Sequence, residues 1–266
     1  MSTNYDAFGK RMKEFYEQVP RIRLVRRMPV MIRIDGKAFH TFTKGFRKPF
    51  DDILIESMQE TMKYLCENIQ GCVFGYTQSD EITLILIDYK KLTSSAWFDY
   101  EVQKMVSVSA SMATMIFNKI FYQKYNNFFF NSTTREYIED CEYFKKYEEA
   151  SKKGAIFDSR CFNVPKEEVT NFIYWRQLDA IRNSIQMLGQ ANFSHKELQN
   201  KTCNMIQDML LTKKGINWND LPTVKKRGSA CIRDAEGHWF IDKNMPILKT
   251  TEEADYRYYI NKLIYF

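Results

Sequence analysis

Two apolar segments separated by a short polar connection constrain the fold of this chain most strongly. Residues 72–76 (CVFGY) and 82–87 (ITLILI) flank the five polar residues 77–81 (TQSDE). The second segment is an almost continuous apolar run rich in β-branched residues, which is typical of a central strand buried on both faces. A connection of this length predicts a hairpin between the two strands. The chain is therefore expected to build a sheet that other elements cover on both sides.

Helical and extended patterns surround this hairpin. Apolar residues recur at helical spacing over 52–69, where Asp51 or Asp52 can cap the first turn. The stretch 126–154 mixes aromatic residues with both signs of charge, and we interpret it as an irregular or partly helical surface insertion. The remaining patterns predict helices over 97–125, 167–190 and 195–211, and strands over 29–35, 157–164, 226–234 and 238–242. Together they predict a mixed α/β fold.

Composition restricts the class of protein further. The 266 residues are 44% hydrophobic and 27% charged, and no apolar run reaches the roughly 18 residues that a membrane helix needs. Residues 1–19 lack the apolar stretch of a signal peptide and are too acidic for a transit peptide, so a cytoplasmic location without membrane contact is expected. The six scattered cysteines favour reduced thiols over a zinc site or disulfides. A net charge of +6 gives a weak preference for an anionic partner such as RNA.

Common catalytic and phosphate-binding motifs do not occur. The chain has 10 glycines and contains neither G-x-x-x-x-G-K-[ST] nor G-x-G-x-x-G. Both motifs need glycine for the close approach of backbone to phosphate, so a P-loop ATPase and a Rossmann dehydrogenase are disfavoured. The G-x-S-x-G nucleophile elbow is also missing, and the three histidines, His40, His195 and His238, do not suggest a histidine-rich metal site.

Carboxylates stand at the ends of the predicted strands. Asp35 ends the first strand before Gly36, and Asp80 and Glu81 lie at the tip of the hairpin. If these strands are neighbours in one sheet, Asp35 and Asp80 meet at one edge and repel each other unless a cation lies between them. Oxygen ligands favour Mg²⁺, and two such ions about 3.5–4 Å apart can activate a hydroxyl and neutralise a leaving group. The same residues are equally common in turns that end strands, so the spacing leaves both interpretations open.

Six motifs in order resemble the tRNA-His guanylyltransferase family. They are RIDGKAFHTF at 33–42, RKPFDD at 47–52, YTQSDE at 76–81, FDSR at 157–160, WRQLDAIRNSI at 175–185 and KKRGS at 225–229. The resemblance implies an antiparallel sheet backed by helices, like the palm of polymerases and nucleotidyl cyclases, followed by a helical and β-hairpin C-terminal region. It divides the chain into a catalytic region, 1–165, which contains the 126–154 insertion, and a region, 166–266, that completes the RNA site within the same compact unit.

The resemblance also implies a nucleotidyltransferase site with two Mg²⁺ ions. Asp35, Asp80 and the Gly36 carbonyl would hold the metals, and Glu81 matches the third acidic residue of the catalytic motif. The implied nucleotide-binding residues are Lys37, Ala38, Phe39, His40, Lys48, Asp51, Ser79, Lys104 and Arg160, with ordinary surface positions as the alternative for His40 and Lys48. Because Glu101 replaces a family arginine, the triphosphate pocket is expected to differ in detail.

Basic and polar residues of the C-terminal region are candidates for RNA binding. The helix expected over 167–190 has an apolar stripe of Leu178, Ile181, Ile185 and Leu188, and an opposite polar side that includes Arg176 and Arg182. The candidates for tRNA backbone contacts are Arg176, Arg182, Asn183, Lys225, Lys226 and Arg227, and a solvated polar face is the alternative for those on the helix.

The implied reaction adds nucleotides to the 5′ end of tRNA, with ATP and GTP as substrates. ATP adenylylates a 5′-monophosphorylated tRNA, and the 3′-hydroxyl of a nucleoside triphosphate then attacks the activated phosphate, so the chain grows from 3′ to 5′. True tRNA-His guanylyltransferases carry a His-Ile-Asn-Asn tetrad where this chain reads Ile-Arg-Asn-Ser at 181–184. In the missing tetrad and in the YTQSDE motif, the chain resembles the branch of the family that repairs truncated tRNAs. We therefore expect template-dependent addition, with 5′ guanosine addition to tRNA-His as the alternative.

Two other classes of function stay open at this point. A nucleotidyl cyclase would share the two-metal site but need no RNA, and the basic cluster at 225–227 counts against it. A non-catalytic tRNA-binding protein would need broken carboxylates, whereas Asp35, Asp80 and Glu81 are intact. Family precedent implies a homotetramer built as a dimer of dimers.

Overall fold

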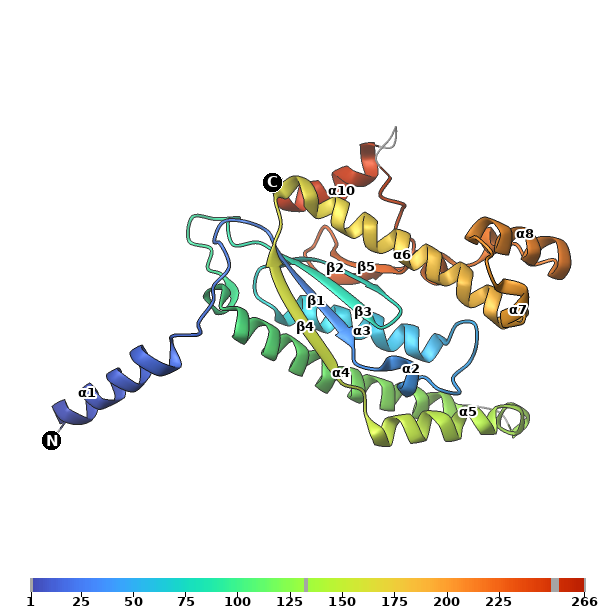
Figure 1. Cartoon of the computed structure of the whole chain (residues 1–266), viewed down its shortest axis with the longest axis horizontal. Helices are drawn as coiled ribbons and strands as arrows, with labels where there is room; N and C mark the ends of the chain where they lie inside the picture. The colour runs from blue at the N-terminus through green and yellow to red at the C-terminus, as the bar shows by residue number, and fades with distance from the viewer. Residues whose placement is uncertain (1, 132–133, 250–253, 266) are drawn as a thin grey trace.

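A six-stranded antiparallel sheet forms the centre of the computed structural model, which describes residues 2–131, 134–249 and 254–265. The strand order is β4-β1-β3-β2-β5-β6 (Figure 1). The strands are β1 Val30–Gly36, β2 Cys72–Gln78, β3 Glu81–Leu86, β4 Phe157–Asn163, β5 Ser229–Arg233 and β6 Trp239–Asp242. Every neighbouring pair is antiparallel, which confirms the fold class expected from the sequence.

Helices cover both faces of this sheet (Figure 1). Their bounds are α1 Ser2–Met12, α2 Phe39–Phe42, α3 Asp52–Asn68, α4 Val102–Asn131, α5 Thr134–Lys153, α6 Lys166–Asn192, α7 His195–Leu198, α8 Cys203–Lys214, α9 Thr223–Arg227 and α10 Ala254–Tyr265. A π-helical turn (Lys13–Glu17) and two 3₁₀ turns (Trp97–Tyr100 and Trp218–Asp220) complete the elements. The helices α3 and α4 lie on one face, and α6 and α10 lie on the other. None of the helices within the described ranges is long and apolar enough to cross a membrane.

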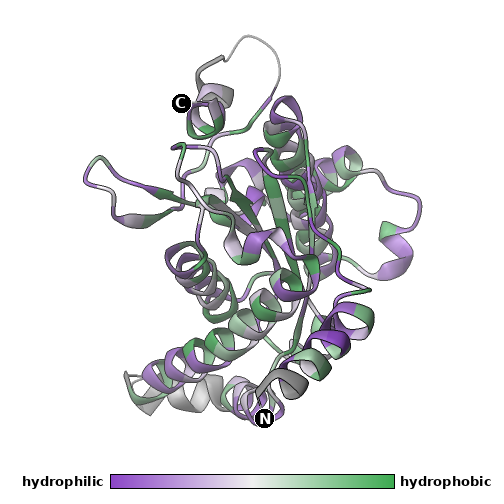
Figure 2. Cartoon of the chain, turned by 90° about the vertical axis from the view of Figure 1, so that its left-hand side faces the viewer, coloured by the Kyte–Doolittle hydropathy of each residue, from purple (hydrophilic) through white to green (hydrophobic). Residues whose placement is uncertain are grey.

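The alternation of side chains along β1 decides which residues face the site. Val30, Ile32 and Ile34 are buried in the core beneath α3 and α4, whereas Met31 belongs to the second core, with residues of α6 and α10. Because successive side chains point to opposite faces, Arg33 and Asp35 lie on the same face as Met31. Figure 2 shows how strongly apolar the central strands are, as the ITLILI run predicted.

The stretch 126–154 differs from the expected surface insertion. In its described residues the long helix α4 continues to Asn131, and α5 packs back against it. Phe144, Tyr147 and Ala150 of α5 are buried, so this part of the expectation is wrong. The three residues form an apolar stripe at helical spacing, which the surrounding charges concealed in the sequence. The segment is a helical hairpin that contributes to the core.

The C-terminal hairpin extends the same sheet, because β5 pairs with β2. This pairing brings Cys231 close to Cys66, and burial together with the neighbouring thiols of Cys231 and Cys72 raises the pKa of the Cys66 thiol. The five cysteines that the structure describes are free thiols, in line with the sequence, and the side chain of Cys141 lies outside the described part. The helix α1 extends away from the body as an N-terminal arm (Figure 1).

Candidate active site

Asp35 and Asp80 meet where the inner strand β1 ends and the neighbouring strand β3 begins, in agreement with the prediction from strand ends. Asp35 is the cross-strand partner of Glu81, and the amide of Gly36 donates a hydrogen bond of 3.0 Å to the carbonyl of Asp80. Burial raises the pKa of the Asp80 carboxyl, and the charge of Asp35 raises it further. A desolvated carboxylate beside a second one is stabilised by a cation, so the chemistry of this pair fits Mg²⁺.

The chain adopts strained conformations on both sides of this carboxylate pair. Ser79 and Asp80 form a two-residue hairpin turn, and Ser79 has a positive φ of 51° where such turns usually place glycine. Ala38, in the loop after β1, has a φ of 53°. Positive φ in residues other than glycine is uncommon and is concentrated at functional sites.

Gly36 is required by the close approach of an aromatic ring. A Cβ atom at this position would lie 2.2 Å from Cδ2 of Phe39. The ring of Phe39 packs against Phe117 and Phe157 at centroid distances of 5.6 and 5.1 Å. Because Phe39 is held in the core in this way, only glycine fits between Asp35 and the loop that follows.

A cleft of about 480 Å³ opens beside the carboxylate pair. It is lined by Gly36, Ala38, Phe39, His40, Thr43, Phe46, Arg47, Lys48, Pro49, Asp51, Leu54, Ser79, Asp80 and Met187. Six of the nine residues expected to bind nucleotide, namely Ala38, Phe39, His40, Lys48, Asp51 and Ser79, are in this set. The other three, Lys37, Lys104 and Arg160, do not line it. Its volume lies in the range of small-molecule sites.

Asp51 shapes the wall of this cleft. It is the N-cap of α3 and accepts hydrogen bonds from the amides of Leu54 (2.9 Å) and Arg47 (3.1 Å). The hydroxyl of Tyr147 in α5 donates a third bond of 2.6 Å. These bonds connect the start of α3 to the helical hairpin and fix the loop that carries Lys48.

Glu81 is buried between two arginines. Its Oε2 accepts a hydrogen bond of 2.6 Å from Arg33, and its Oε1 lies 2.7 Å from Nε of Arg176. Burial raises the pKa of the Glu81 carboxyl, and the two guanidinium groups oppose this shift. Both carboxylate oxygens of Glu81 therefore face protein cations. Through Arg33 and Arg176, Glu81 connects β3 to β1 and to α6.

The expectation that Arg176 lies on an exposed polar side of α6 is wrong. Arg176 is 4% exposed and also binds Asp179 at 2.8 Å, whereas Leu178, expected in the apolar stripe, is 46% exposed. The helical periodicity of the sequence misplaced both residues, because it does not reveal that Arg176 has a buried partner in Glu81. Arg176 stabilises the site from behind, and its surface is closed to RNA.

Four of the other five expected RNA contacts gather at a second, smaller cleft. Asn183 and the three cations of α9, Lys225, Lys226 and Arg227, line this cleft of about 90 Å³, which shares Asp51 and Ser79 with the first. Each cation also has a protein partner: Lys225 binds Asp52 at 2.8 Å, Lys226 the Asn219 carbonyl, and Arg227 the Met245 carbonyl. Arg182 is exposed and forms an ion pair with Asp179. The basic cluster thus adjoins the nucleotide-sized cleft.

Asp158 is a carboxylate near the site that the sequence did not identify. It lies directly across from Asp35 in the β1–β4 register, and its side chain is exposed and binds Arg160 at 3.0 Å. This neighbour and the charges of Asp35 and Glu81 raise the pKa of Arg160. The FDSR motif contains both residues, but the register that brings Asp158 to Asp35 is a property of the fold.

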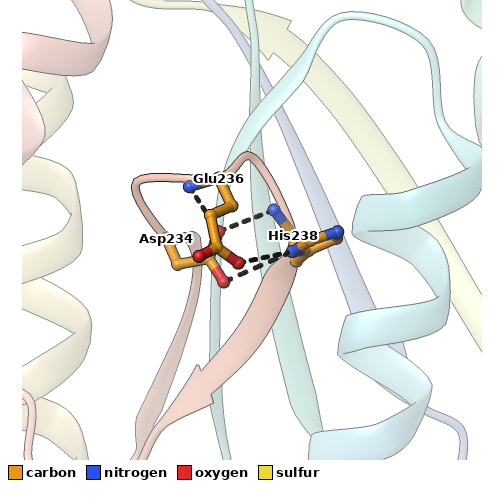
Figure 3. Close-up of side chains that lie close together, drawn as sticks. All are labelled: Asp234, Glu236 and His238. Carbon is orange, nitrogen blue, oxygen red and sulfur yellow. Dashed lines mark hydrogen bonds and ion pairs between the residues drawn. The ribbon is translucent and has the colours of Figure 1, made fainter.

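A separate group of ligand-type side chains lies at the turn between β5 and β6. Figure 3 shows Asp234, Glu236 and His238 close together, with His238 Nδ1 3.7 and 3.5 Å from the two carboxylates. Asp234 accepts hydrogen bonds from the amides of His238 and Glu236, which lower the pKa of its carboxyl. All three residues are exposed, and the bonds of Asp234 account for the shape of the turn. This group is far along the sheet from Asp35, since β5 and β1 are separated by β2 and β3.

Known proteins resemble this chain over most of its length. The family model for tRNAHis guanylyltransferase (Thg1) matches residues 9–165. The tRNA(His) guanylyltransferase of Saccharomyces cerevisiae is 25% identical over 221 residues, which cover 78% of this chain and 83% of that protein. A bacterial tRNA(HIS) guanylyltransferase (Thg1)-like protein in complex with ATP has a TM-score of 0.81 and 43% identity, covering 97% of this chain and 100% of that one. A bacterial Thg1-like protein in complex with GTP has a TM-score of 0.74 and 39% identity with the same coverage.

Proposed function

Because the chain belongs to the tRNAHis guanylyltransferase (Thg1) family and is a nucleotidyltransferase, we propose that it repairs tRNAs that lack nucleotides at their 5′ end. It adds nucleotides in the 3′-to-5′ direction and selects each one by pairing with the opposite strand of the acceptor stem. The observation that carries this proposal is the meeting of Asp35 and Asp80 beside a cleft of about 480 Å³. Relatives of high structural similarity bind ATP and GTP, which supports the assignment of that cleft to a nucleotide.

The reaction has two steps at the same carboxylate pair. An oxygen of the tRNA 5′-phosphate attacks the α-phosphorus of ATP, and pyrophosphate leaves. The 3′-hydroxyl of the incoming nucleoside triphosphate then attacks the activated 5′-phosphate, gives up its proton, and AMP leaves. Asp35, Asp80 and the Gly36 carbonyl would hold two Mg²⁺ ions, which would supply Lewis acidity to the phosphate oxygens. The protein positions the reacting groups and forms no covalent intermediate.

Residues of the cleft hold the nucleotide. The exposed ammonium of Lys48 contacts its phosphates, and His40 lies beside its base. The hydroxyl of Ser79 donates a hydrogen bond of 3.0 Å to Asp80, which restricts the orientation of that carboxylate. The cations of α9 hold the RNA backbone where the two clefts adjoin.

Contacts of α6 support template-dependent addition over guanosine addition. Ser184 donates a hydrogen bond of 2.6 Å to the Lys225 carbonyl and accepts one from the indole of Trp218. Ile181 packs against the core formed by α6 and α8. At two of the four positions where true guanylyltransferases carry their tetrad, this chain therefore uses side chains to anchor neighbouring elements. This chain therefore lacks the side chains of the tetrad at these positions, which agrees with the proposed selection of the base by the template strand.

Nucleotide addition to tRNAs with a varied opposing base tests this proposal. All four nucleoside triphosphates are offered to tRNAs missing their first nucleotide, with ATP and Mg²⁺ present. Addition of the Watson–Crick complement of the opposing base is the expected result. Addition of guanosine regardless of that base, and only to tRNA-His, would assign the chain to the true guanylyltransferases.

The same incubation separates the other classes of function. A nucleotidyl cyclase would release a cyclic nucleotide without RNA, and a non-catalytic tRNA-binding protein would give no labelled product. The protein acts in the cytoplasm as a homotetramer. The helix α1 and the π-helical turn after it support assembly because they expose Phe8, Phe15 and Tyr16. A molar mass of one chain by light scattering would contradict the tetramer.

A further inference from the structure

A half-exposed tryptophan on α6 contacts the two arginines that bind Glu81. Trp175 is 50% exposed, although it is the largest apolar side chain type and sits beside a well-packed core. The guanidinium of Arg176 lies over its ring at 4.4 Å from the centroid, and that of Arg33 lies at 6.0 Å. Phe172 contacts the ring at 5.4 Å in an edge-on arrangement. These contacts fix the orientation of the ring, while half of the residue's surface stays exposed to solvent.

The contacts of Trp175 place it near the reacting groups. Arg33 and Arg176, which hold its ring, are the two arginines that bind Glu81, and Glu81 is the cross-strand partner of Asp35. Arg33 precedes Asp35 by two residues on the same face of β1, which is a distance of about 7 Å along a strand. The ring is therefore within the reach of one nucleotide from the metal-binding carboxylates.

The nucleotide cleft and the surface around Trp175 come from different elements. Among the described residues that line the cleft, none belongs to β4 or to the first half of α6. Arg160 is the cross-strand partner of Arg33 in β4, and its exposed guanidinium binds Asp158, which lies across from Asp35. The proposed reaction joins two nucleotide units at the carboxylate pair. One unit occupies the cleft, and the other needs a surface on the opposite side of Asp35.

We propose that Trp175 is the stacking platform for the 5′-terminal base of the RNA. This inference rests on the proposed function and names the subsite that holds the RNA end during attack. Arg160 lies next to this platform and contacts the phosphate of the stacked nucleotide. Because every base has a π face, stacking holds the end of the RNA without selecting its identity. Such a platform suits an enzyme that must extend tRNAs with different terminal bases.

Binding of paired RNA hairpins tests this platform. One acceptor-stem hairpin carries a 5′-monophosphate on an ordinary terminal nucleotide, and the other carries it on an abasic nucleotide. The wild-type protein should bind the first roughly 5- to 150-fold more tightly, which is the range expected for stacking one base on an aromatic side chain. Trp175→Ala should lose this preference, and Trp175→Phe should keep most of it.

Two controls show whether the loss is specific. Phe240→Ala removes an exposed aromatic residue from β6, at the opposite edge of the sheet, and should leave the preference unchanged. Trp175→Ala should also bind ATP as tightly as the wild type, since the residue does not line the cleft. Weaker ATP binding by this variant would mean that the ring only supports the Arg33–Glu81–Arg176 network, and would overturn the platform.

The remaining outcomes distinguish this inference from the proposed function. If Trp175→Ala keeps the full preference for the hairpin with a terminal base, the platform is wrong while the proposed function stands. If the variant changes the oligomeric state and leaves the preference intact, the surface is a contact between copies of the chain, which also overturns the platform. If the wild type binds and labels neither RNA, the proposed function itself fails.

Discussion

Replacing Glu81 by glutamine tests whether this residue supports the site from behind or binds the metals. Glu81 lies between Arg33 and Arg176 at 2.6 and 2.7 Å, and Glu81 and Arg176 are both 4% exposed. Glu81→Gln keeps the volume of the side chain but leaves two guanidinium groups without their shared anion. Removing one partner of a buried ion pair costs about 3–5 kcal/mol. Since the amide oxygen still accepts a hydrogen bond, we expect about 3 kcal/mol, or a melting temperature lower by roughly 6–12 °C.

Thermal unfolding with and without Mg²⁺ measures both effects. The loss of stability should be the same in either condition, and the stabilisation by Mg²⁺ should remain as large as in the wild type. Glu60→Gln removes one partner of the exposed ion pair with Lys124 and should cost less than about 1 kcal/mol. If Glu81→Gln unfolds near the wild-type temperature and no longer responds to Mg²⁺, Glu81 is a metal ligand and its structural role is refuted.

Three further perturbations follow from the site. Gly36→Ala should destabilise the fold by about 1–3 kcal/mol, because the added Cβ would lie 2.2 Å from the Phe39 ring. Gly9→Ala adds its Cβ in open space and should not destabilise the fold, and urea unfolding compares the two variants. Charge reversal of Lys225, Lys226 and Arg227 together should weaken tRNA binding and leave the affinity for ATP unchanged. The slope of log affinity against log salt concentration should flatten by about 0.7–0.9 per lost phosphate contact, and an unaltered slope would mean that the cluster is only structural. The folded protein holds the Asp80 proton more tightly than the unfolded chain does, since burial raises its pKa. Without metal, the stability of the fold should therefore fall as pH rises from the pKa of an ordinary aspartate through the raised pKa of Asp80. The affinity for Mg²⁺ should fall as pH drops through the same raised pKa. Calorimetric titration with Mg²⁺ at several pH values should find this loss of affinity in the wild type and not in Asp80→Asn.

Patterns within single segments predicted most elements of the fold. The apolar runs at 72–76 and 82–87 are β2 and β3, and the helical spacing over 52–69 corresponds to α3 with Asp51 as its N-cap. These features depend on neighbours in the sequence, which decide backbone hydrogen bonding and side-chain periodicity. The meeting of Asp35 and Asp80 needed one assumption, that their strands are adjacent, and the β1–β3 pairing satisfies it.

Patterns within single segments could not predict the contacts between distant segments. Arg176 and Glu81 are 95 positions apart, and no periodicity of α6 reveals that an arginine on it is buried against a carboxylate. Asp158 reaches Asp35 only through the register of β4, and a shift of one residue would have placed it on the other face. The sequence shows Trp175 only as one position of a helical motif. Its contacts with Arg33 and Arg176 depend on the packing of α6 against the sheet.

Transfer of label from ATP to tRNA by variants of the two aspartates tests the central claim most directly. The wild type, Asp35→Asn and Asp80→Asn are incubated with α-labelled ATP, Mg²⁺ and 5′-monophosphorylated tRNA lacking its first nucleotide, after circular dichroism has shown that each is folded. Loss of a metal ligand removes charge neutralisation in the transition state, so both variants should label the tRNA at least about 10³-fold more slowly than the wild type. Labelling at a rate near that of the wild type by either folded variant would contradict the account.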